Sequence, residues 1–124
     1  PINFALETFG DKWTLLVIRD LLFKGKRYYT EFLDSDEGIS TNILADRLKA
    51  LELSGLVEKE VDPNKRSRMI YRLTDKGLGL LPIMLEITAW SKQHDSLSNA
   101  PDEFVEAFKQ DKEALAAHIL AERD

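Results

Sequence analysis

No cysteine occurs among the 124 residues of this sequence. Its absence excludes disulfide scaffolds, thiolate zinc sites and cysteine nucleophiles for these residues. No apolar run is long enough to span a membrane and no secretory signal pattern opens the sequence, so we expect a cytoplasmic protein. His94 and His118 stand alone, without a second ligand at metal spacing or a serine arrangement for nucleophilic catalysis. The sequence also lacks a glycine-rich phosphate loop and paired carboxylates, and we therefore expect no enzyme, metal or cofactor.

The chain is acidic overall, but its excess of negative charge is confined to the C-terminal end. The formal net charge is −5 with a pI near 5.1, whereas nucleic-acid-binding domains are usually basic. Residues 1–94 hold 14 Lys and Arg against 14 Asp and Glu, while residues 95–124 hold three against eight. The sequence therefore predicts a neutral domain at 1–96, followed by an acidic helical extension at 97–124.

Residues 41–54 are predicted to form an amphipathic helix whose two ends are marked in the sequence. Ser40 is a good N-cap, and Gly55 stands where a left-handed C-terminal residue is favoured. One face carries Leu44, Leu48 and Leu51, and the opposite face carries Asn42, Ala45, Asp46 and Lys49, with Ser40 and Thr41 at the N-terminus. The second face offers an amide for adenine, a small residue for close approach, a carboxylate for cytosine and a cation. These groups suit a DNA major groove, although a merely solvated helix face has the same composition.

The segment after this helix predicts a β-hairpin with a basic tip. Residues 56–61 alternate apolar and charged side chains, with Val57 and Val61 on the apolar side of a half-buried strand. A turn follows at residues 62–64, and residues 69–73 return as the second strand. The basic residues at the tip are Lys65, Arg66 and Arg68. We expect this wing, residues 62–68, to hold DNA phosphates or the minor groove, and solvation of the turn is the alternative.

Further helices are predicted on both sides of this unit. We expect short helices at 2–9, 12–23 and 28–33, and one long helix from Thr74 to about residue 96 that is kinked at Pro82. The long helix has little polar surface, so part of it should meet another subunit. Beyond it, an acidic amphipathic segment is expected to form one helix or two. Trp13 and Trp90 fit core packing better than an aromatic effector pocket.

In this order the elements resemble the HxlR-type winged-helix transcriptional regulators of bacteria, which are relatives of the MarR group. The resemblance is carried by residues 9–21 with Gly10-Asp11-Lys12-Trp13-Thr14, by Gly38-Ile39-Ser40, by Ser54-Gly55-Leu56-Val57, and by Leu73-Thr74 with Gly77, Pro82 and Trp90. It covers residues 1 to about 94. The resemblance implies a homodimer that binds a pseudopalindromic operator, with the first and last helices of this part at the dimer interface.

The sequence departs from the family pattern in three places. Relatives often carry arginine and glutamine where Asn42 and Asp46 stand, so the operator sequence cannot be taken from a relative. Relatives also often carry a cysteine just before the proline equivalent to Pro1. The 124 residues of this sequence contain no cysteine, so they offer no thiol sensor. The segment from Ser98 onward is longer than the usual family ending and would be available to the dimer interface, a ligand pocket or a partner.

The sequence thus predicts a mostly helical α+β winged helix-turn-helix fold, with a two-stranded wing hairpin and with N- and C-terminal dimerisation helices. The predicted function is a dimeric DNA-binding transcriptional regulator that reads double-stranded DNA with helix 41–54, and any small-molecule effector is unknown. A winged helix that binds proteins instead of DNA is the alternative, which the acidic balance favours slightly. Arg47 lies nearer the buried stripe than the reading face, so we expect it to form a structural ion pair.

Overall fold

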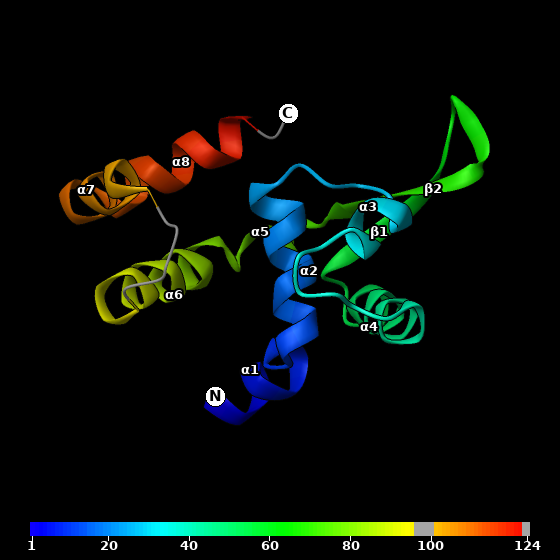
Figure 1. Cartoon of the computed structure of the whole chain (residues 1–124), viewed down its shortest axis with the longest axis horizontal. Coiled ribbons are helices and arrows are strands. Elements are labelled where there is room, and N and C mark those ends of the chain that lie inside the picture. Colours follow the sequence, from blue (N-terminus) through cyan, green and yellow to red (C-terminus); the bar gives the residue numbers. More distant parts are fainter. Residues whose placement is uncertain (96–100, 123–124) are drawn as a thin grey trace. The chain divides into compact units, whose positions relative to one another are not determined.

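The computed structural model describes residues 1–95 and 101–122 (Figure 1). The elements are α1 Ile2–Phe9, α2 Lys12–Phe23, α3 Tyr29–Leu33, α4 Thr41–Leu53, β1 Val57–Asp62, β2 Lys65–Leu73, α5 Asp75–Leu78, α6 Leu81–His94, α7 Asp102–Gln110 and α8 Lys112–Glu122. They confirm the predicted, mostly helical fold with a two-stranded hairpin.

The chain divides into two compact units, Pro1–Leu78 and Gly79–Asp124. The predicted boundary between residues 96 and 97 lies outside the described residues and stays a prediction. No helix in the described ranges is long and apolar enough to cross a membrane.

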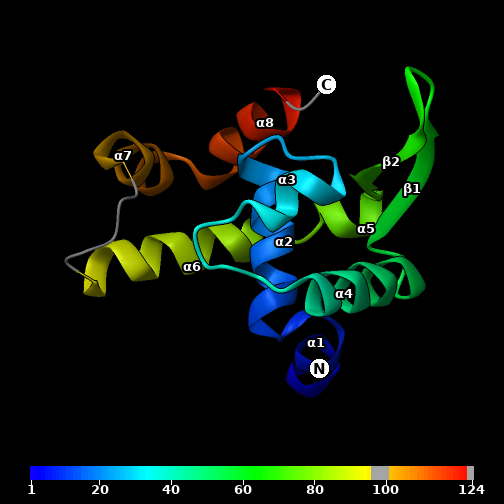
Figure 2. The ribbon, with the colours of Figure 1, turned by 45° about the vertical axis from the view of Figure 1, so that its right-hand side comes forward.

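The core of the first unit forms around α2, which packs against α4 and β2. Asp11 caps the N-terminus of α2, and its carboxylate accepts a hydrogen bond from the backbone N of Thr14 at 3.0 Å. Its buried apolar residues Val17, Ile18, Leu21 and Leu22 are joined by Phe32 of α3 and by Leu44, Leu48 and Leu51 of α4. These apolar faces group α2, α3 and α4 at the base of the hairpin (Figure 2).

Helix α4 begins and ends as its sequence predicted. The Ser40 hydroxyl accepts a hydrogen bond from the backbone N of Ile43 at 3.2 Å. Gly55 follows the last turn with φ +78°, a left-handed conformation that residues with a Cβ rarely adopt. Both predicted caps are therefore confirmed, and they fix which face of α4 is turned away from the core.

The hairpin departs from its predicted pattern at one point. Val61 pairs with Met69, but the register then shifts and Asp62 pairs with Lys65. The pairing is regular from Val57 to Val61, so Val61 shares a face with Val57 as predicted. Its predicted burial is wrong, because Val61 is 50% exposed, whereas Asp62, beyond the register shift, is 1% exposed. The second strand begins at Lys65 rather than at Met69, so the basic residues of the tip belong to a strand and not to a loop.

The single long helix predicted from Thr74 is wrong, because the structure has two helices there. The Thr74 hydroxyl accepts a hydrogen bond from the backbone N of Gly77 at 3.2 Å and caps α5, as predicted. A turn at Gly79 and Leu80 separates α5 from α6. Pro82 lies in the first turn of α6, where a missing N–H costs nothing, so it begins a helix instead of kinking one.

In the second unit, α6 packs against α7 and α8. The acidic segment forms two helices, and the Lys112 ammonium at the start of α8 lies 2.8 Å from the carboxylate of Glu86 on α6. The Phe104 and Phe108 rings of α7 stack with centroids 6.0 Å apart. The prediction that Trp90 packs in the core is wrong for the single chain, because its side chain is 65% exposed.

Candidate nucleic-acid interface

The outward face of α4 carries the residues that the sequence assigned to DNA reading. The structure exposes all six of them: Ser40, Thr41, Asn42, Ala45, Asp46 and Lys49. They lie opposite the buried leucines of the same helix, so the fold leaves these polar groups available to a ligand. Their contacts with bases remain a prediction.

The loop that leads into α4 is anchored by an ion pair that the sequence did not reveal. The Arg19 guanidinium of α2 donates two hydrogen bonds to the Glu37 carboxylate, at 2.6 and 2.9 Å. The same guanidinium donates to the buried Asp20, at 2.9 and 3.0 Å. Gly38 then turns the chain with φ +74°, and Ile39 is buried just before Ser40. These contacts position the N-terminus of α4.

The ion pair between Arg19 and Glu37 predicts that the folded state is less stable in acid. The hydrogen bond from Arg19 lowers the pKa of Glu37 from 4.5 to about 2. A carboxylate with a lowered pKa in the folded state stabilises the fold above pH 4.5, and this contribution is lost as the pH falls toward 2. Thermal melts of Glu37→Gln followed by circular dichroism should therefore depend less on pH in this window than those of the wild type. Glu58→Gln, which removes an exposed carboxylate of β1, should keep the wild-type pH profile, and parallel profiles for all three proteins would contradict the assignment.

Arg47 forms the structural ion pair that was predicted for it. Its Nε donates to the Asp11 carboxylate at 2.8 Å, which ties α4 to the start of α2. This hydrogen bond holds the pKa of Asp11 at about 2, below its ordinary 3.8. Arg47 also donates to Asp46 through Nη1. The carboxylate that was predicted to accept from cytosine thus has an intramolecular partner with which a base must compete.

The wing presents two kinds of basic residue. Lys65 and Arg66 are exposed at the tip. Arg68 instead donates from Nε and Nη2 to the buried Asp62, the first of these at 2.9 Å. Its guanidinium also lies 3.8 Å from the centroid of the Tyr28 ring. The backbone N–H of Asn64 and then Arg68 lower the pKa of Asp62.

Asp62 and Tyr28 are therefore parts of the site that the sequence reasoning missed. The Asp62 carboxylate accepts a hydrogen bond from the backbone N of Asn64 at 2.9 Å. This bond closes a local turn of a kind that aspartate favours. The Asp-Pro-Asn sequence signals that turn, but not the ion pair with Arg68 across the bulge. The proposed phosphate contact of Arg68 stays a prediction, and the structure adds to it a role in joining the wing to the start of α3.

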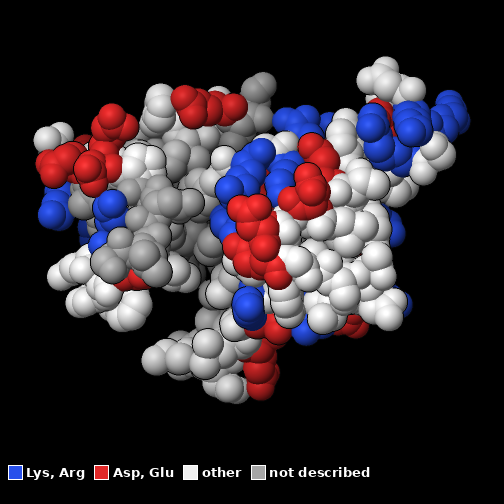
Figure 3. Space-filling model, in the orientation of Figure 1, with Lys and Arg blue, Asp and Glu red and all other residues white. Residues whose placement is uncertain are grey.

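The charged side chains are unevenly placed on the surface. Lys and Arg gather over the wing hairpin, and Asp and Glu are prominent over α7 (Figure 3). In the described ranges, no group of three histidine or acidic side chains could hold a metal ion. His94 and His118 are both exposed, and His118 lies 3.1 Å from Glu122.

Known proteins match this chain over the part that contains α2, α4 and the wing. A family model described as HxlR-like helix-turn-helix matches residues 8–99. Two proteins of Bacillus subtilis, the uncharacterized HTH-type transcriptional regulator YvaP and the HTH-type transcriptional regulator YodB, are each 36% identical over 89 residues. This stretch is 72% of this chain, 82% of YvaP and 79% of YodB. Reduced YodB superposes with a TM-score of 0.62 at 33% identity, covering 77% of this chain and 92% of that structure. The redox regulator HypR in its oxidised form gives a TM-score of 0.69 at 28% identity, covering 78% and 99%.

Proposed function

This chain belongs to the HxlR-like helix-turn-helix family, and on that premise we propose that it binds a pseudopalindromic DNA operator as a homodimer. It is a DNA-binding transcriptional regulator of the winged-helix type. In the proposal, α4 lies in the major groove and the wing contacts the adjacent backbone or minor groove. No catalytic step is part of this role, and the cytoplasm is the compartment we expect for it.

One observation carries the proposed mode of DNA binding. The exposed polar face of α4 and the exposed cations Lys65 and Arg66 belong to the same compact unit. The first can read base edges, and the second can neutralise phosphates without reading sequence. The acidic residues that give the chain its net charge lie mainly beyond residue 94, outside this unit. A protein-binding winged helix would not require this pairing of surfaces.

Exposed apolar residues on two helices support the homodimer. Helix α1 has no buried residue, and it exposes Ile2, Phe4 and Leu6 by 78%, 69% and 60%. Helix α6 exposes Ile83, Ile87 and Trp90 by 40%, 43% and 65%. Such surfaces on a small domain mark contacts with another chain, and a second copy of this chain accounts for both.

Selection from a pool of random duplexes tests the proposal, because the bound sequences themselves reveal the operator. We expect enrichment of an inverted repeat whose half-sites are about one helical turn apart, roughly 34–36 Å centre to centre. If the folded protein enriches no sequence from the pool, the result favours the protein-binding alternative. An enriched site also supplies the operator for the experiments below.

The role of the wing predicts a change in salt dependence. Replacing Arg66 with Gln should reduce the slope of log K against log salt by about 0.9, because one phosphate contact is lost. Arg72→Gln is a matched control: it removes the same charge from β2, but Arg72 pairs with Glu60 at 3.1 Å. Fluorescence anisotropy titrations over a series of salt concentrations measure both slopes. If both variants change the slope equally, the effect comes from net charge and the wing contact is wrong.

A further inference from the structure

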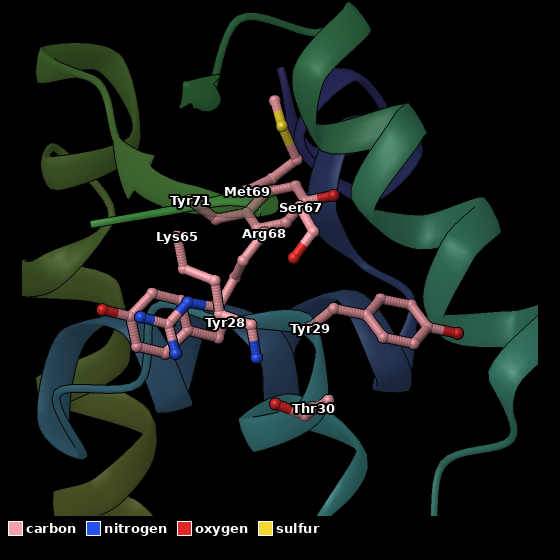
Figure 4. A pocket seen from close by; sticks show the side chains of 8 residues that line it. All are labelled: Tyr28, Tyr29, Thr30, Lys65, Ser67, Arg68, Met69 and Tyr71. Carbon is pink, nitrogen blue, oxygen red and sulfur yellow. The ribbon is translucent and has the colours of Figure 1, made fainter. Parts of the chain in front are cut away.

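A cavity lies between β2 and the start of α3, beside the proposed reading surface (Figure 4). Its volume is about 390 Å³. The lining residues are Tyr28, Tyr29, Thr30, Lys65, Ser67, Arg68, Met69 and Tyr71. Two separate parts of the DNA-binding unit thus meet there, namely the first helix of the helix-turn-helix and the wing.

The side chains around this cavity suit an anion. The lining contains two cations and several hydroxyl groups, and none of its eight residues is acidic. Lys65 and Ser67 reach from β2 toward the start of α3 (Figure 4). The nearby carboxylates already accept hydrogen bonds from the protein: Asp62 from Arg68, and Glu31 from the backbone N of Tyr28 at 3.0 Å. Because Arg68 is paired with Asp62, the charge that an anion would meet in the cavity comes from Lys65, which enters no ion pair in the part of the chain that the structure describes.

The walls of the cavity are held in place before any ligand arrives. The ion pair with Asp62 and the ring of Tyr28 fix the Arg68 guanidinium from two sides. The Tyr29 hydroxyl donates to the backbone O of Thr41 at 3.2 Å, which connects the cavity to the first residue of α4. Tyr71 packs edge-on against Phe32, with ring centroids 6.1 Å apart. Such preorganisation lowers the cost of ordering the site on binding.

The position of the cavity identifies the anion when the proposed DNA-binding mode is taken as the premise. With α4 in a major groove and the wing in the adjacent minor groove, the sugar-phosphate strand between the two grooves has to pass between these elements. The cavity has β2 as one wall, and its other wall is hydrogen-bonded to the start of α4. We propose that this cavity seats one phosphodiester of the crossing strand, with Lys65 supplying charge and with Thr30 and Ser67 donating hydrogen bonds.

A scan of neutral phosphates tests this seat. In a series of operator duplexes, one phosphate at a time is replaced by an uncharged methylphosphonate. We expect the wild-type protein to lose roughly tenfold in affinity at one position per half-site, between the base pairs read by α4 and those next to the wing. The double variant Thr30→Val, Ser67→Ala should bind the unmodified operator more weakly and should lose little further affinity at that position. At all other sensitive positions, the double variant and the wild type should respond alike.

The two substitutions suit the test because both side chains are exposed, and neither enters a side-chain hydrogen bond within the described part of the chain. Ser35→Ala, which removes a hydroxyl from the turn after α3, should keep the full wild-type pattern. Equal methylphosphonate penalties for the double variant and the wild type at every position would overturn the seat and leave the DNA-binding proposal standing. If the wild type binds no selected duplex, the proposed function itself fails, so the two failures are distinguishable.

Discussion

Replacing Trp90 with Glu is expected to separate the proposed dimer into monomers and to weaken operator binding by roughly 100-fold or more. Trp90 shares one stripe of α6 with Ile83 and Ile87, because residues spaced by three and four lie on the same helix face. A carboxylate on that stripe would have to lose its hydration without a partner. Each monomer would then bind a half-site alone and lose the effective concentration that the second copy provides. Sedimentation velocity and anisotropy titration measure the two effects.

Ala117→Glu is the matched control for this prediction. It adds the same charge to an exposed position of α8, in the same compact unit, and should leave both assembly and affinity unchanged. Circular dichroism has to show that the Trp90 variant keeps its helices. If that variant remains a dimer with wild-type affinity, the stripe of α6 that carries Ile83, Ile87 and Trp90 is not the interface. Phe4→Glu on α1, where Phe4 is 69% exposed, then tests the other apolar surface separately.

The parts of the fold that could be predicted from the sequence are those set by local chemistry. Ser40 and Gly55 determine the ends of α4 through a side-chain cap and a left-handed turn, and each acts within a few residues. The period of the leucines then determines which face of α4 is outward. The same angular spacing places Arg47 beside the buried stripe, where an ion pair is expected, and Asp11 provides its partner from α2.

The parts that could not be predicted depend on contacts between distant segments or on the exact register. The alternation of apolar and charged residues does not reveal the register shift at Asp62. Beyond this shift the Asp62 carboxylate is buried and pairs with Arg68. The stacking of Arg68 on Tyr28 joins residues far apart in the sequence. The sequence predicts Pro82 inside a helix because the apolar pattern continues through the turn at Gly79. Apolar periodicity reports which residues avoid water, but it does not report where the backbone breaks.

Asn42 is expected to provide the largest contribution of a single side chain to sequence reading. It is exposed in the first turn of α4, which is the part of a recognition helix that approaches base edges. Replacing it with Ala should cost about 1 to 3 kcal/mol on the operator, or roughly 5- to 150-fold in affinity, because a bidentate contact with adenine is lost. Binding to random DNA should change little, since phosphate contacts remain. Anisotropy titrations on both duplexes measure the difference.

A modified operator separates a lost base contact from a disturbed helix. Substituting 7-deazaadenine for the contacted adenine removes the N7 acceptor but keeps the base pair. The wild-type protein should lose affinity on this duplex, whereas Asn42→Ala should not lose more, because the two changes remove the same interaction. Gln110→Ala removes an exposed amide from the end of α7, outside the compact unit that contains α4, and should behave as the wild type on every duplex. Additive losses from Asn42→Ala and 7-deazaadenine at each adenine would show that Asn42 supports the helix without reading a base, and α4 would then depend on its other exposed residues for specificity.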